Sequence, residues 1–144
     1  MTSSFQLQNK LKFLPCFAGV FPCDRIPSIQ HLPKAFIINT DKHDESGEHW
    51  VAIYISDDKN GYYFDSYGMP PINKEIQQFL NTNCISWKYN TRCIQGLNSI
   101  KCGQFCVLFI ILKAIGYTFN QITFLFTENY KLNDLFIQKI FDVL

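Results

Sequence analysis

The stretch Gln95-Gly96-Leu97-Asn98-Ser99-Ile100-Lys101-Cys102-Gly103-Gln104-Phe105-Cys106 runs directly into an apolar segment, residues 107–115. Turn-forming residues precede Cys102, whereas the residues after it are apolar on most faces, as in a buried helix. Gly116 follows as a helix stop. We therefore predict a loop that leads into a buried helix, with Cys102 in the first turn of that helix.

The position of Cys102 favours nucleophilic chemistry. The first turn of a helix carries unpaired N–H groups and the positive end of the dipole, and both stabilise a thiolate. A thiolate is the nucleophile in thiol chemistry, so Cys102 is the predicted nucleophile. Cys106 lies one turn further along the same face and is the alternative, although its deeper position favours a buried, inert thiol.

Composition limits the classes of protein that fit. The chain has 144 residues, 47% of them apolar and 16% aromatic, which predicts a single domain spanning residues 1–144 with a sizeable core. The net charge of +1 and the absence of a dense basic run argue against a nucleic-acid-binding protein. No run of about 18 apolar residues or secretory leader is visible. The six cysteines are therefore expected to be reduced thiols.

Hydrophobic periodicity predicts an α+β fold with a small, mostly antiparallel sheet flanked by helices. The clearest signal is a β-hairpin formed by residues 49–56 and 62–65 around a turn at 57–61. Other expected strands cover residues 35–38 and 85–89, whereas residues 17–27 and 40–47 read as irregular connections. Helices are expected over residues 3–13, 72–80, 102–115 and 119–126. A C-terminal amphipathic helix is expected to pack through Leu132, Leu135, Phe136, Ile140 and Val143.

The hairpin brings two further candidate residues together. His49 precedes its first strand and Asp65 ends its second, so both should lie near the open end, although the sequence does not fix the face on which each points. His49 is a candidate general base and Asp65 a candidate for orienting the imidazole. Gln95 is a candidate oxyanion donor through its side-chain amide, together with the backbone N–H of Cys102.

These residues also carry a family resemblance. Gly47-Glu48-His49-Trp50, Phe64-Asp65-Ser66-Tyr67-Gly68 and the 95–106 stretch resemble, in order, the three motifs of the adenovirus maturation protease. That family consists of cysteine endopeptidases related in fold to SUMO-specific proteases, and the likeness extends over roughly residues 15–116. It implies His49 as base, Asp65 as its partner, Gln95 as oxyanion donor and Cys102 as nucleophile. It also implies substrates cleaved next to glycine, typically capsid or other virion precursor proteins, and action in the virion and the infected cell, in cytoplasm or nucleus.

The chain departs from the family pattern in three ways. Adenoviral members have glutamate where this chain has Asp65, whereas the SUMO-protease relatives use aspartate. The chain is also much shorter after the Cys102 helix. Adenoviral members are activated by DNA and by a peptide that forms a disulfide; the resemblance implies Cys84 for such a disulfide, whereas the near-neutral charge argues against DNA dependence. No cofactor is required by the sequence.

Several other interpretations remain open. The same residues could remove ubiquitin-like modifiers, although the seven-residue gap from Gln95 to Cys102 favours the viral maturation type. The chain could also be a catalytically silent binding module with the same fold. A zinc site would need His49, Cys93, Cys102 and Cys106, in a spacing that is unusual for zinc. Trp50 is either a core residue or a cation–π partner of His49.

Overall fold

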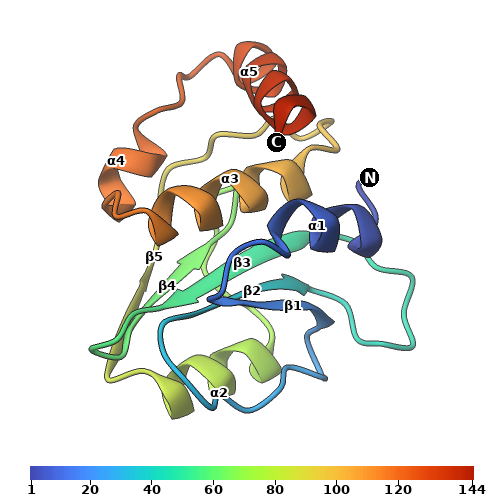
Figure 1. Ribbon diagram of the computed structural model, residues 1–144. Helices are drawn as coiled ribbons and strands as arrows, with labels where there is room; N and C mark the ends of the chain where they lie inside the picture. Colours follow the sequence, from blue (N-terminus) through green and yellow to red (C-terminus); the bar gives the residue numbers. More distant parts are fainter.

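A five-stranded sheet with helices on both faces makes up the computed structural model, which describes residues 1–144 (Figure 1). In chain order the elements are α1 (Ser4–Leu11), β1 (Phe17–Pro22), β2 (Lys34–Asn39), β3 (Trp50–Ile55), β4 (Asn60–Phe64), α2 (Lys74–Asn83), β5 (Ser86–Tyr89), α3 (Cys102–Ala114), α4 (Phe119–Thr123) and α5 (Tyr130–Val143). The predicted α+β class is confirmed.

The sheet is mixed, so the prediction of a mostly antiparallel sheet was wrong. Its strand order is β1-β2-β3-β4-β5. The two central pairings, β2–β3 and β3–β4, are antiparallel, whereas β1–β2 and β4–β5 are parallel. Parallel neighbours need a crossover connection. Here α2 supplies the crossover between β4 and β5, and the segment 23–33 supplies the crossover between β1 and β2.

The predicted hairpin is confirmed and forms the middle of the sheet. Ala52 pairs with Phe64 and Ile55 with Gly61. The chain reverses just before β4, where Lys59 has a φ of 64°. Because the pairing is antiparallel, His49, just before β3, and Asp65, just after β4, lie at the same end of the sheet.

Each face of the sheet has its own core. Along β3 every residue is buried, and alternate residues belong to different cores: Ala52 packs with α3, and Ile53 with α2. Helices α1 and α3 lie on one face of the sheet, α4 and α5 pack against α3, and α2 covers the other face (Figure 1). Helix α3 is therefore enclosed between the sheet and α5, which explains why its sequence is apolar on most sides.

Most other predicted elements are confirmed, including α1, which Ser3 caps through a capping box with Gln6. The irregular connection predicted for residues 17–27 was wrong at its start, because residues 17–22 form β1. Gly19 has a φ of 139° at an irregularity of the β1–β2 register, a conformation that glycine tolerates. Pairing with β2 thus overrides a local composition rich in proline and glycine.

Helix α5 exists as predicted, but the expected packing face was wrong. Its buried residues are Asn133, Ile137 and Phe141, whereas Leu135 is 63% exposed and Val143 is 82% exposed. The Asn133 side chain explains the orientation, because it donates a buried hydrogen bond of 3.0 Å to the Ile94 carbonyl. The buried face therefore combines a polar anchor with the apolar side chains of Ile137 and Phe141, and Ile140 of the predicted face packs against the same core. No helix has both the length and the apolar character needed to cross a membrane.

Candidate active site

Cys102 is the first residue of α3 and is almost completely buried, with 3% of its surface exposed. The first N–H groups of a helix have no acceptor within it and remain available to other groups. The next residue is Gly103, where a Cβ would lie 3.0 Å from Leu7 Cδ2 and 3.1 Å from Trp50 Cδ1. The missing side chain therefore lets the helix start lie close to the beginning of β3, beside His49.

His49 and Asp65 are joined by a hydrogen bond of 2.8 Å between His49 Nε2 and Asp65 Oδ1. The same carboxylate oxygen accepts the Tyr67 backbone N–H at 2.9 Å. Asp65 is itself fixed by the buried side chain of Asn90, which accepts the Asp65 N–H at 2.9 Å and donates to the Asp65 carbonyl at 2.6 Å. The Asn90 amide thus continues the pairing of β4 and β5 beyond the end of the strands and holds the carboxylate in place.

The surroundings of His49 favour its charged form. Burial by itself lowers the pKa of the ring, but hydrogen bonds to Asp65 and Cys102, together with their negative charges, outweigh it and raise the pKa of His49 to about 9. Nε2 is engaged with Asp65, so Nδ1 is the nitrogen left for the Cys102 sulfur. The arrangement brings together an imidazolium, a carboxylate and a thiol at one end of the sheet.

Tyr67, rather than Trp50, stacks on the imidazole. The ring centroids of His49 and Tyr67 are 4.9 Å apart and the planes differ by 28°. The Trp50 indole instead donates to the Thr2 carbonyl at 3.0 Å and lies in the core below α1 and α3. Only the position of Tyr67, two residues after Asp65, could have selected it in advance.

Gln95 lies beside this cluster and is 1% exposed. Its Oε1 accepts a hydrogen bond from the Ser66 hydroxyl, and its Nε2 donates to the Ser99 carbonyl at 3.0 Å. The Ser66 carbonyl also accepts the backbone N–H groups of Ile94 at 2.9 Å and Gln95 at 3.2 Å. Ser66 thus ties the segment that carries Asp65 to the segment that carries Gln95.

Helix α5 covers the loop between Gln95 and Cys102. Besides Asn133, which holds the Ile94 carbonyl, Gln138 accepts hydrogen bonds from Lys101 and, at 2.8 Å, from Gln104. These contacts join α5 to both ends of the loop. They were not predicted, because they connect residues more than thirty positions apart that belong to no motif.

The remaining candidate residues lie away from this cluster or are closed to solvent. Cys106 is fully buried, and burial raises its pKa well above the ordinary value. Cys84 is half-buried against Gly61, at the opposite end of β4 from Asp65, about 13 Å along the strand. All six cysteines are free thiols. No group of three or more His, Cys, Asp or Glu side chains is placed to hold a metal ion, so His49, Cys93, Cys102 and Cys106 do not converge as a zinc site would require.

The family of the chain follows from comparison with known proteins. A family model described as adenovirus endoprotease matches residues 13–135. The chain belongs to this family. The matched region contains His49, Asp65, Gln95 and Cys102, together with the start of α5.

Individual adenovirus endoproteases give the same result. The bovine adenovirus 2 protease is 32% identical over 111 residues, and the human adenovirus B serotype 3 protease is 31% identical over 112. Each alignment covers 67% of this chain but only 54% and 53% of the respective relative, so the chain spans about half the length of these proteases. Among solved structures, an ASFV protease superimposes with a TM-score of 0.62 at 15% identity, covering 95% of this chain and 66% of the other, which shows a shared fold.

Proposed function

We propose that the chain is a cysteine endopeptidase in which Cys102 is the nucleophile, His49 the general base and acid, and Asp65 the residue that orients the imidazole. The observation that carries the proposal is His49, whose Nε2 is hydrogen-bonded to the Asp65 carboxylate and whose pKa is raised by both Asp65 and Cys102. A nucleophile, a base and a group that orients the base are the three parts that thiol catalysis requires.

The reaction follows from these positions. The Cys102 proton resides on His49 in a thiolate–imidazolium pair, and the thiolate attacks the carbonyl carbon of the scissile peptide bond. His49 then donates the proton to the leaving amine, and the C–N bond breaks to leave a thioester on Cys102. A water molecule gives a proton to His49, its oxygen attacks the thioester, and the acid product and free thiol are released.

Gln95 and the backbone N–H of Cys102 form the proposed oxyanion site. The Gln95 Nε2 carries two hydrogens, of which one is donated to the Ser99 carbonyl. We assign the second to the oxygen of the tetrahedral intermediate. Because the Ser66 hydroxyl holds Gln95 Oε1, the amide is already oriented before substrate binds, which is the condition for effective electrostatic stabilisation.

Family membership supports viral capsid and other virion precursor proteins as substrates, cleaved next to glycine, and hence action in the virion and the infected cell. The proposed chemistry uses no metal or cofactor.

We retain an activating peptide that pairs with Cys84 as a separate proposal. Cys84 lies at the far end of β4 from Asp65. Such a peptide would therefore influence the site by stabilising β4, and would not contact the reacting atoms. Full activity without any added peptide, in both the wild type and Cys84→Ser, would refute the proposal of an activating peptide.

Selective labelling tests the nucleophile first. Iodoacetamide at pH 6, followed by mass spectrometry, should modify Cys102 faster than Cys16 and Cys84, two half-buried thiols whose pKa burial raises. Incubation with a library of proteome-derived peptides should then yield cleavage next to glycine with the wild type and none with Cys102→Ala. Equal labelling of the three thiols together with no cleavage would favour a silent binding module. Cleavage confined to fusions of ubiquitin-like modifiers would favour the isopeptidase interpretation.

A further inference from the structure

One face of α5 runs along the loop between the proposed oxyanion residue and the nucleophile. Tyr130, Asp134 and Gln138 recur every four residues and therefore share a face of the helix. At one end the Tyr130 Cβ lies 3.4 Å from where a side chain at Gly96 would begin. At the other end Gln138 accepts from Lys101 and Gln104, at the start of α3. Asp134, between them, must face the same loop.

The carboxylate of Asp134 has no partner there. Its Oδ1 is buried and makes no hydrogen bond. The chain has three ion pairs, and Asp134 is in none of them. The cations of the neighbouring segments are engaged elsewhere: Lys101 donates to Gln138, and Arg92 donates to the Thr123 carbonyl. A buried carboxylate oxygen without a donor is unfavourable, and a cationic donor would satisfy it best.

Asp134 also lies near the proposed catalytic residues, because Tyr130 and Gln138 on the same face of α5 lie beside Gly96 and Lys101, the neighbours of Gln95 and Cys102. Burial, together with the negative charges of Cys102, Asp65, Cys93 and Asp134, raises the pKa of Tyr67, which stacks on His49. Tyr130 is 41% exposed and Tyr67 is half-buried, so the region is open to a peptide chain. Two tyrosine rings and an unpaired carboxylate are a suitable environment for a lysine or arginine side chain.

We propose that Asp134 is a specificity residue that binds a lysine or arginine side chain of the peptide substrate close to the scissile bond. This inference rests on the proposed endopeptidase function and names a feature of its substrates. The face from Tyr130 to Gln138 is about 12 Å long, which corresponds to three or four residues of an extended peptide. The basic residue is therefore expected within about four positions of the cleaved bond.

The test compares cleavage-site preferences in the full chain. The wild type, Asp134→Asn and Asp134→Lys are incubated with the same peptide library, and cleaved products are identified by mass spectrometry. Asp57→Asn is the matched control, because Asp57 is an exposed carboxylate in the turn between β3 and β4, at the opposite end of the hairpin from His49, and belongs to no ion pair. Asparagine keeps the shape of aspartate, so Asp134→Asn should fold normally.

Sites cleaved by the wild type and by Asp57→Asn should be enriched in Lys or Arg within about four positions of the bond. Asp134→Asn should lose this enrichment, and its kcat/KM on a basic peptide should fall about 10-fold, with little change on a neutral version of that peptide. Asp134→Lys should instead favour Asp or Glu at the same position. Iodoacetamide labelling of Cys102 should be equal in all variants.

Wild-type cleavage without a basic preference would overturn the inference and leave the endopeptidase function intact. So would a basic preference that survives in Asp134→Asn. If the wild type cleaves no peptide although Cys102 is labelled selectively, the endopeptidase function itself fails, and the inference fails with it.

Discussion

Replacing Asp65 with asparagine isolates the electrostatic support of His49. Asparagine has the same shape and still offers an oxygen to the Tyr67 backbone N–H, so the segment should remain folded. It lacks the negative charge that favours the imidazolium. The raised pKa of His49 means that the ring is charged at neutral pH and loses its proton only as the pH rises through about 9. Removing the negative charge of Asp65 must therefore lower the pKa of His49, so that the ring loses its proton at a lower pH.

The structure gives the size of the effect. A pKa of about 9, against an ordinary value of 6.5, corresponds to about 3.4 kcal/mol in favour of the charged ring. Without Asp65, burial opposes only the contribution of Cys102, and we expect the pKa to return to about 6.5. At pH 8 the protonated fraction would fall from about 90% to about 3%, roughly 30-fold, whereas at pH 6 it would change by less than about twofold.

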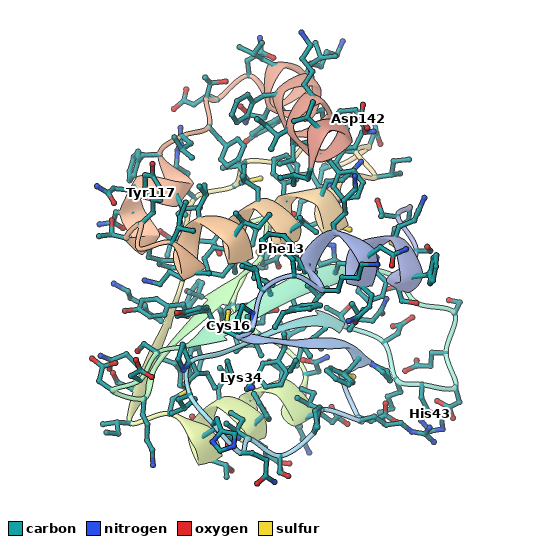
Figure 2. All side chains as sticks on the ribbon, viewed as in Figure 1. Phe13, Cys16, Lys34, His43, Tyr117 and Asp142 are labelled. Atoms are coloured by element: carbon teal, nitrogen blue, oxygen red, sulfur yellow. The ribbon has the colours of Figure 1, made fainter.

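Two measurements check this reasoning. The chain has three histidines, so an NMR titration of the imidazole carbons can follow His49 directly once its signal is assigned with His49→Gln. The alkaline limb of kcat/KM should lie near pH 9 in the wild type and move to lower pH in Asp65→Asn. Asp24→Asn is the control, since Asp24 pairs with His43 in the loop between β2 and β3 at the edge of the molecule (Figure 2). That variant should leave the His49 signal unchanged.

The reasoning would be refuted by a His49 that titrates near 6.5 in the wild type. It would equally be refuted by a titration that stays near 9 in Asp65→Asn. A loss of kcat/KM by the same factor at pH 6 and pH 8 would indicate that Asp65 only orients the ring, and that its charge does not set the protonation of His49.

Three further predictions concern the oxyanion donor, the stacked ring and the edge of the sheet. Gln95→Ala should lower kcat about 10²–10³-fold with little change in KM, and a rise in KM alone would contradict the oxyanion role. Tyr67→Phe should keep near-wild-type kcat/KM, whereas Tyr67→Ala, which removes the ring stacked on His49, should lose about 3–10-fold; equal losses would point to the hydroxyl instead. Gly61→Ala places a Cβ 2.5 Å from Cys84 Sγ and should reduce the free energy of unfolding in urea by about 1–3 kcal/mol, with partial recovery when Cys84→Ala is added.

The part of the site that could be predicted from the sequence depends on local rules. The turn-then-apolar pattern located the start of α3 at Cys102, because capping and burial act within a few residues. The position of His49 near Asp65 followed from the symmetry of one hairpin, whose strands adjoin in the chain. Even there, only the folded sheet shows the register of the two strands, and hence the direction in which each side chain points.

Contacts between distant segments were decided only by the tertiary structure. The sequence suggested Trp50 as a possible partner of the imidazole, but Trp50 packs under α1 and Tyr67 stacks on His49 instead. Of the apolar residues predicted to pack α5 on the domain, Leu135 and Val143 are exposed, whereas Ile140 packs against the core. The folded chain also buries the polar Asn133, because its amide satisfies the Ile94 carbonyl next to Gln95. Hydrophobic periodicity indicates which face of a helix is apolar. It does not indicate which buried carbonyl elsewhere in the fold needs a hydrogen-bond donor.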